Sequence, residues 1–555
     1  MRPANEVMRL SRMGAAFPSR LSMARRLLRA LSNANASVAR THWKIDENGY
    51  GEAVYGVTFG SRTLSLCCFS NPLGTNERSD RVIASAWDAG FALYDGVPDA
   101  QVLSRLAQTV PHQEAARFEA SEFVLSRANR SVRAFEHVAD ALAKGRQPQW
   151  DIVHRVGYLM RTTAVYGNGK FGIADRSRLV DDALLRAPFQ AELLSVFLIR
   201  EFTLDLVEHV AQARGGTQAV CLAPHMREAF GVGNSTGLGM APFLVNHPDL
   251  LHRWVRVRET ALSRVRAVPF GQSAATRFVQ TLARARAHVG QWRVDDPEQS
   301  TRIAVLETEL EHALAMFTVP WLATKPQPWD AVFRAVRDWS LEAQECLVSV
   351  LLEPHSALID DLTEQMASDE ALVLDPAMSL ASLGEALHSV FGWALAIDFT
   401  QRGASARFWY VSAQKLEPRL GERYDEPGAE RELPLDIARA AQALSVAVEA
   451  QDAHLSVGQF LFAHPRFRYI VRRVQYASRA PYAEIRDNLL DSSCRPLDML
   501  RFKLACLGAS KFDPRSDRWT RVTLFQGAPS ASALGDAGLS DWSFPVFPTT
   551  QRSSF

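Results

Sequence analysis

Residues 188–214 read PFQAELLSVFLIREFTLDLVEHVAQAR. Apolar side chains surround this run on almost every side at 3.6 residues per turn, which predicts a helix buried in the protein. The acidic residues Glu201, Asp205 and Glu208 are four and three positions apart, so they share one helical face, with His209 beside them. Buried carboxylates must be paired, protonated or bound to metal. We expect salt bridges to arginine, because no second acidic or histidine pair with metal-site spacing occurs.

Two glycine-dense polar segments flank the predicted helix. They read YGNGKFG at residues 166–172 and GVGNSTGLG at residues 231–239. Glycine allows positive φ and brings backbone N–H groups close to a ligand, which favours anion pockets. The alternative is structural, with the first segment a turn between two helices and the second a helix-to-helix connection.

Neither segment completes a known nucleotide-binding motif. A phosphate-binding P-loop requires glycine where Ala164 stands and a hydroxyl where Phe171 stands. The spacing of Gly233, Gly237 and Gly239 fits some dinucleotide-binding turns, but those turns follow a strand. Here residues 226–230 look helical and Pro242 interrupts any helix that follows. The sequence therefore specifies no cofactor and no metal.

We expect a site for an anion where the two glycine segments meet. Lys170 and Arg161 would bind or polarise the anion, and His247 would transfer a proton. Polar side chains that would orient the ligand are Asn168, Asn234, Ser235 and Thr236. A surface or helix-capping role is the alternative for His247.

Arg127 and Arg130 form a second candidate set. They lie three residues apart on a predicted helix, where both could reach one anion. An exposed, solvated helix face explains the pair equally well.

Composition describes an ordinary globular protein of several domains. The 555 residues are 47% apolar, and 62 Lys+Arg against 61 Asp+Glu leave a net charge of +1. No overall field favours nucleic acid or an anionic membrane, and no stretch approaches the ~20 apolar residues of a membrane span. Scattered cysteines without CxxC spacing favour reduced thiols and a cytoplasmic location. They are Cys67, Cys68, Cys221, Cys346, Cys494 and Cys506.

Local patterns predict an α+β fold that is predominantly α-helical, with a small N-terminal β-sheet followed by a multi-helix body. Residues 55–59 and 64–68 alternate in polarity around Gly60-Ser61, which predicts a β-hairpin. Arginine-rich residues 1–42 only superficially resemble a mitochondrial presequence, and we expect an unstructured or amphipathic basic extension. The predicted segments are 1–42 (extension), 43–97 (β-rich), 98–290 (helical, with both glycine segments), 291–425 (helical), 426–530 (helical) and 531–555 (tail).

The sequence predicts a cytosolic enzyme that acts on a small anionic metabolite bearing a carboxylate or phosphate. Its reaction class is not determined, and a noncatalytic helical scaffold or regulatory binding protein is the alternative. Residues 466–476 interleave arginine with aromatics, a pattern that suits single-stranded nucleic acid. The neutral net charge and the lack of a recognised module argue against nucleic acid as a partner. Long apolar helices are compatible with a homodimer.

Overall fold

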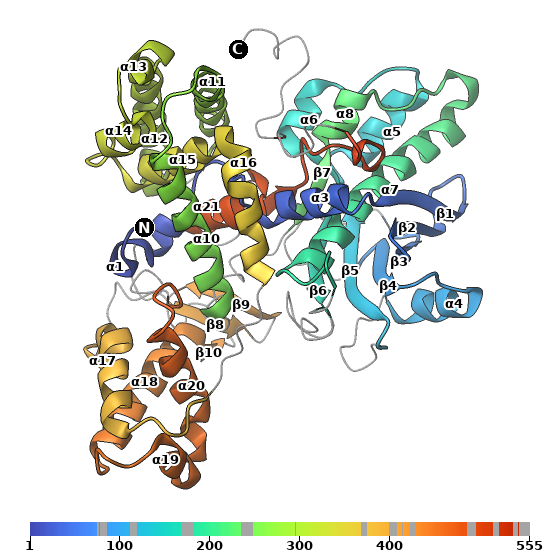
Figure 1. The fold of residues 1–555 in the computed structure, drawn as a ribbon. Coiled ribbons are helices and arrows are strands. Elements are labelled where there is room, and N and C mark those ends of the chain that lie inside the picture. Colours follow the sequence, from blue (N-terminus) through green and yellow to red (C-terminus); the bar gives the residue numbers. More distant parts are fainter. Residues whose placement is uncertain are drawn as a thin grey trace.

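The computed structural model describes residues 1–74, 77, 86–110, 119–167, 179, 182–234, 248–294, 296–367, 374–398, 408–412, 415–421, 429–484, 496–513, 521–536 and 542. A twisted sheet and its covering helices form one side of the molecule, helices form the other, and a small helical module projects below (Figure 1). This arrangement confirms the predicted helix-dominated α+β class.

A nine-stranded sheet has the order β1-β2-β3-β4-β5-β6-β7-β12-β11. Neighbouring strands are antiparallel except for β6 and β7, which are parallel. The sheet extends beyond the predicted N-terminal unit, because residues 122–234 and 510–524 add strands to it. The strands are β1 (Ser37–Ile45), β2 (Gly51–Phe59), β3 (Arg62–Ser70), β4 (Ala89–Asp95), β5 (Glu122–Arg130), β6 (Tyr158–Gly167), β7 (Gly231–Asn234), β11 (Ser510–Asp513) and β12 (Arg521–Leu524).

The predicted hairpin is confirmed in β2 and β3. Phe59 pairs with Arg62, so only Gly60 and Ser61 form the turn. Gly60 has φ +57°, which a two-residue hairpin turn requires and glycine adopts without a steric penalty.

Helices cover both faces of the sheet. Helix α7 (Gln190–Gly215) crosses one face, where Phe202 packs edge-on against Tyr55 and Phe91, with ring centroids 6.3 and 5.6 Å apart. Helix α4 (Ala100–Thr109) covers part of the other, where Leu106 belongs to the same buried hydrophobic cluster as Val54. The prediction of a buried helix over residues 188–214 is therefore confirmed. Other helices beside the sheet are α5 (Phe135–Ala143), α6 (Trp150–Val156) and α8 (Pro224–Ala229).

The N-terminal segment is packed into the core, in contrast to the expected extension. Helices α1 (Ala4–Val7), α2 (Leu10–Met13) and α3 (Met23–Asn33) bury both their apolar side chains and several arginines. The arginines tolerate burial because distant carboxylates pair with them. Arg25 pairs with Glu353, and Arg26 Nη2 lies 2.8 Å from Glu364.

The helical body follows the sheet in the chain. Side chains cap some of its helices: the Asp296 side chain accepts from Gln299 N at the start of α12, and the Ser340 side chain accepts from Ala343 N at the start of α15. The helices are α10 (Pro248–Arg266), α11 (Gln272–Val289), α12 (Pro297–Met316), α13 (Val319–Ala323), α14 (Pro328–Ala335), α15 (Leu341–Leu352) and α16 (Ser356–Ile359), with 3-10 helices η4 (Glu353–His355) and η5 (Asp360–Ala367).

A helical module projects from this body (Figure 1). Its helices are α17 (Leu380–Leu395), α18 (Leu433–Glu449), α19 (Val457–Ala463) and α20 (Arg468–Ala477). A three-stranded sheet has the order β10-β8-β9, with β8 (Phe408–Ser412), β9 (Lys415–Gly421) and β10 (Ala429–Glu432).

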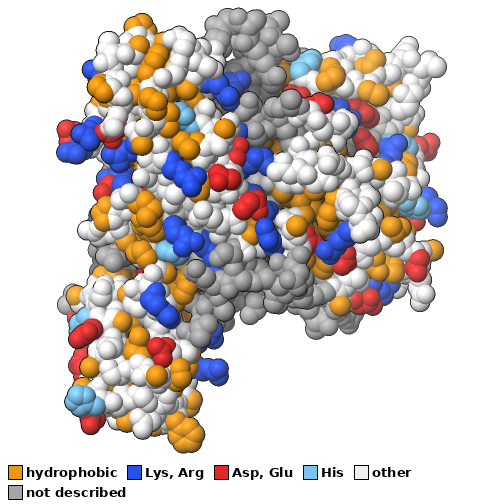
Figure 2. All heavy atoms as spheres, in the orientation of Figure 1, with side chains coloured by type: hydrophobic (Ala, Val, Ile, Leu, Met, Phe, Trp, Pro, Cys, Tyr) orange, Lys and Arg blue, Asp and Glu red, His pale blue; other side chains and the backbone are white. Residues whose placement is uncertain are grey.

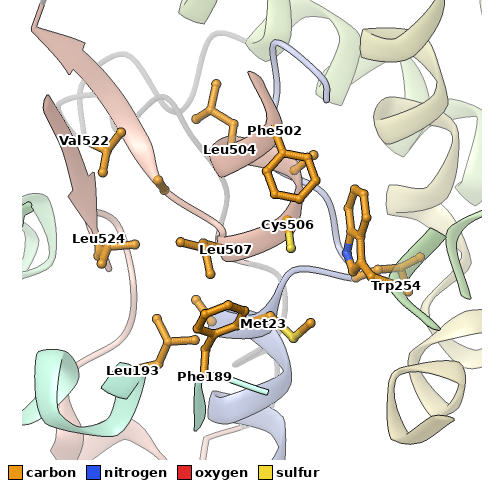
Figure 3. Packing of buried hydrophobic residues seen from close by; sticks show 14 of the residues in the cluster. Met23, Phe189, Leu193, Trp254, Phe502, Leu504, Cys506, Leu507, Val522 and Leu524 are labelled. Atoms are coloured by element: carbon orange, nitrogen blue, oxygen red, sulfur yellow. The ribbon is translucent and has the colours of Figure 1, made fainter. Parts of the chain in front are cut away.

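The sheet and the helical body share one hydrophobic core. Figure 3 shows Met23 of α3, Leu193 of α7 and Leu524 of β12 gathered around the end of α21 (Pro496–Leu507), while Trp254 of α10 packs edge-on against Phe502 from the other side. On the surface that Figure 2 draws, basic and acidic side chains are interspersed, in keeping with the net charge of +1. No helix in the described part of the chain has the length and apolar character needed to cross a membrane. The segment boundaries proposed from the sequence remain predictions.

Candidate functional site at the ends of strands β6 and β7

The two glycine-dense segments begin on neighbouring strands. Gly167 ends β6 and Asn234 ends β7, and the two strands run parallel with Arg161 paired to Gly233 and Thr162 paired to Asn234. Parallel neighbours run toward the same edge of a sheet, but β6 continues five residues past Thr162, the partner of Asn234, so β7 ends before β6. Residues 158–167 and 231–234 are strands, so each glycine segment begins in a strand, and the remainder of both segments lies outside the described residues. The predicted residues Asn168, Lys170, Ser235, Thr236 and His247 lie outside the described residues.

Arg161 and Asn234 lie on opposite faces of the sheet. Asn234 Nδ2 donates to Thr162 Oγ1 over 3.0 Å, and Thr162 Oγ1 donates to the Gly233 carbonyl over 3.2 Å. Met160, two residues before Thr162, accepts from Thr203 of α7, so Thr162 and Asn234 share the α7 face. Arg161 therefore points to the other face, and it is completely buried.

Arg127 lies on the same face as Arg161. Both arginines belong to adjacent antiparallel strands, in which Arg127 pairs with Ala164 and Asn129 pairs with Arg161. The guanidinium carbon of Arg127 lies 3.7 Å from the ring centroid of Trp87, a cation–π stack that orients the guanidinium plane. Two guanidinium groups thus sit on the face opposite α7, near the end of the parallel pair.

The expected pairing of Arg127 with Arg130 on a helix is wrong, because both belong to strand β5. Residues three apart in a strand point to opposite faces. Arg130 Nη2 donates to the Gly49 carbonyl over 2.6 Å and to Ser70 Oγ over 2.9 Å, and its guanidinium lies over Phe135 of α5. Arg130 therefore ties β5 to the turn before β2 and is not positioned to share an anion with Arg127.

Asp88 and Asn129 support the Trp87 side of the site, and sequence reasoning missed them. Asn129 Oδ1 accepts from Asp88 N over 3.0 Å, and Asn129 Nδ2 donates to the Ala86 carbonyl over 3.1 Å. Asp88, fully buried, accepts from the backbone N of Arg130 over 3.0 Å. These bonds fix residues 86–88 against β5. No local pattern marked them, because the two segments are more than forty residues apart.

The acidic face of α7 forms salt bridges, as expected. Arg227 of α8 lies 3.0 Å from Asp205 and 2.8 Å from Glu208, and Tyr55 also donates to Asp205 over 2.6 Å. Burial works to lower the pKa of Arg227, but the three carboxylates Glu208, Asp205 and Glu201 outweigh it and raise that pKa. Among the described residues, no group of three or more His, Cys, Asp or Glu side chains is arranged to hold a metal ion.

Comparison of the chain with protein-family models, curated proteins and solved structures found no match.

Proposed function

We propose that the protein is a cytoplasmic enzyme that binds a small carboxylate- or phosphate-bearing metabolite at the sheet edge where β6 and β7 end. The parallel pairing of these strands carries the proposal. In open α/β sheets, ligands bind beyond the carboxyl ends of parallel strands, where backbone N–H groups are no longer used by the ladder, and β6 and β7 supply the one such pair among the described strands. β6 and β7 are parallel, and each leads into a glycine-dense segment.

Charge near this edge supports an anionic ligand. Arg161 and Arg127 place two guanidinium groups on one face, and guanidinium binds carboxylate or phosphate in two-point geometry. The stack of Arg127 on Trp87 reduces the rotational freedom that binding would otherwise remove. In this proposal Lys170 polarises the anionic group and His247 transfers a proton.

Ligand-induced stabilisation tests the proposal. Thermal unfolding of the purified protein would be followed with orthophosphate, acetyl phosphate, citrate and other small di- and tricarboxylates. We expect at least one compound to raise the melting temperature, because a ligand that binds only the folded state stabilises it. The increase should be lost in Lys170→Ala and reduced in Arg127→Gln.

Matched controls separate the site from general charge effects. Lys144→Ala and Arg155→Gln remove the same charges at exposed positions away from this edge, and both should keep the ligand response. If Lys170→Ala and Arg127→Gln fold and respond like the wild type, the proposed site is wrong.

A noncatalytic binding protein is the second candidate, and the projecting module favours it. Phe462 of α19 is 94% exposed, and Val446 of α18 and Tyr469 of α20 are more than half exposed. Contiguous exposed apolar patches mark protein-binding surfaces, and these three side chains place exposed apolar area on one module. If no compound stabilises the wild type, this candidate replaces the enzyme.

A further inference from the structure

A second site lies among the helices of the body and the N-terminal segment, apart from β6 and β7 (Figure 1). A cavity of about 740 Å³ opens between the N-terminal segment, the end of α10, α14 and the start of α15. We call it the arginine cavity, because five of its lining residues are arginines. They are Arg2, Arg12, Arg266, Arg334 and Arg337, and Glu6 is the one acidic residue among the described residues that line it.

One wall shares a single carboxylate between two guanidinium groups. Arg266 Nε donates to Asp330 Oδ1 over 2.7 Å, while Arg334 Nε lies 2.7 Å from Asp330 Oδ2. The guanidinium carbon of Arg266 lies 4.3 Å from the ring centroid of Phe333, which orients it further. This wall therefore carries one more positive than negative charge.

The opposite wall contains two buried carboxylates, Glu259 and Glu345, and each pairs with more than one arginine. Arg2 lies 2.6 Å from Glu259 and 2.7 Å from Glu345, and Glu345 also pairs with Arg258 of α10. Arg12 Nη1 donates to Gln344 Oε1 over 3.1 Å and lies 3.4 Å from Glu345. The carboxylates of Glu259, Glu345 and Glu6, the last 3.7 Å from Arg12, match the three arginines Arg2, Arg12 and Arg258, so this wall carries no net charge.

Arg337 adds a further positive charge at the mouth. Its side chain is exposed, and no carboxylate of the described residues forms an ion pair with it. Gln344 Nε2 donates to the Arg337 and Trp339 carbonyls over 3.0 and 2.7 Å, so the turn that carries Arg337 is held in place. The mouth thus presents Arg266, Arg334 and Arg337 against the one carboxylate of Asp330.

We propose that the arginine cavity binds a small molecule carrying two or more phosphate or carboxylate groups. Its volume falls in the range of about 300–1,000 Å³ that small-molecule sites occupy. Guanidinium groups fixed by an aromatic ring and by carboxylates bind such anions with little loss of side-chain freedom. The separate location makes this a second ligand site, independent of the proposed reaction at the β6 and β7 edge.

Titration calorimetry with pyrophosphate, ADP, citrate and orthophosphate tests the proposal. We expect the polyanions to bind, with affinity that falls as salt concentration rises, because several charges are paired. The double variant Arg334→Gln/Arg337→Gln should weaken binding about ten-fold or more, since it removes two charge-assisted contacts. Both side chains are exposed, so the variant is expected to fold.

Arg264→Gln is the matched control, because Arg264 lies on α10 two residues before Arg266 but does not line the cavity. It should bind the polyanion like the wild type. Arg127→Gln should also leave this binding intact. If the wild type binds none of the four anions, or the double variant binds them equally well, the proposal is overturned. Loss of binding in Arg127→Gln alone would place the anion at the β6 and β7 edge and overturn it too.

Discussion

Replacing Glu345 by glutamine removes the carboxylate that joins the N-terminal segment to helices α10 and α15. Glu345 is fully buried, and Arg2 Nη1 lies 2.7 Å from it while Arg258 also pairs with it. Burial alone would raise the pKa of Glu345, but the attraction of Arg2 and Arg258 outweighs it and lowers that pKa to about 2. Glutamine has the same shape but no charge, so the variant tests the charge itself.

The size of the effect follows from this pKa. An unperturbed glutamate has a pKa of about 4.3, and each unit of difference between the folded and the unfolded pKa corresponds to about 1.4 kcal/mol. Ionised Glu345 therefore contributes about 3 kcal/mol at neutral pH. Removing one partner of a buried ion pair costs a similar amount, about 3–5 kcal/mol. Because the folded pKa lies below the unfolded one, this contribution is present above about pH 4.3 and is lost as pH falls toward 2.

Urea denaturation followed by tryptophan fluorescence measures the effect. At pH 7 we expect Glu345→Gln to lower the unfolding free energy of the unit that contains it by about 3 kcal/mol. The difference from the wild type should shrink as pH falls below about 4.3. Glu311→Gln is the control, because Glu311 forms a surface pair with Arg286, and such pairs contribute only about 0–1 kcal/mol. A pH-independent difference, or one below about 1 kcal/mol, would refute the assigned role of the charge.

Three further predictions concern buried groups and backbone packing. Partial burial raises the pKa of Glu192 to about 7, so the stability of the wild type should fall as pH rises from about 4.3 to 7. The stability of Glu192→Gln should not change over this range and should exceed that of the wild type at pH 8, as measured by thermal unfolding at pH 4 and pH 8. Burial and the nearby positive charge of Arg277 lower the pKa of His355 to about 4, so the stability of the wild type should fall as pH drops from about 6.5 to 4. In urea titrations, the stability of His355→Gln should lack this dependence on pH. A Cβ on Gly231 would lie 2.3 Å from the Leu524 carbonyl oxygen, so Gly231→Ala should lower the melting temperature. Gly392 lies within α17 with open space where a Cβ would lie, so Gly392→Ala should raise the melting temperature slightly, because alanine favours a helix over glycine.

Several features could be predicted from local sequence because their causes are local. The Gly60-Ser61 turn needs a residue that tolerates positive φ between two runs of alternating polarity, and the sequence shows both the glycine and the two runs. Helix α7 was visible because its apolar residues recur on all sides over seven turns. The pairing of its acidic face with arginine followed from the cost of burying charge.

The candidate site was predicted only in part. The glycine segments could be recognised in the sequence, and the site there stays a prediction. The polar run around Arg127 has no clear period, and only its hydrogen bonding to β4 and β6 makes it a strand. Whether β6 and β7 are neighbours depends on the crossover through α7 and α8, which brings residues about seventy positions apart into register.

The sequence by itself determined the helix-dominated α+β class, the first hairpin, the long buried helix and its paired acidic face, because each depends on periodicity or on residues a few positions apart. Tertiary structure alone decided the environment of the N-terminal arginines and the arginine cavity. A local sequence rich in arginine favours exposure to water, and burial becomes favourable only when carboxylates such as Glu259 and Glu345, more than 250 residues away, supply the opposite charge.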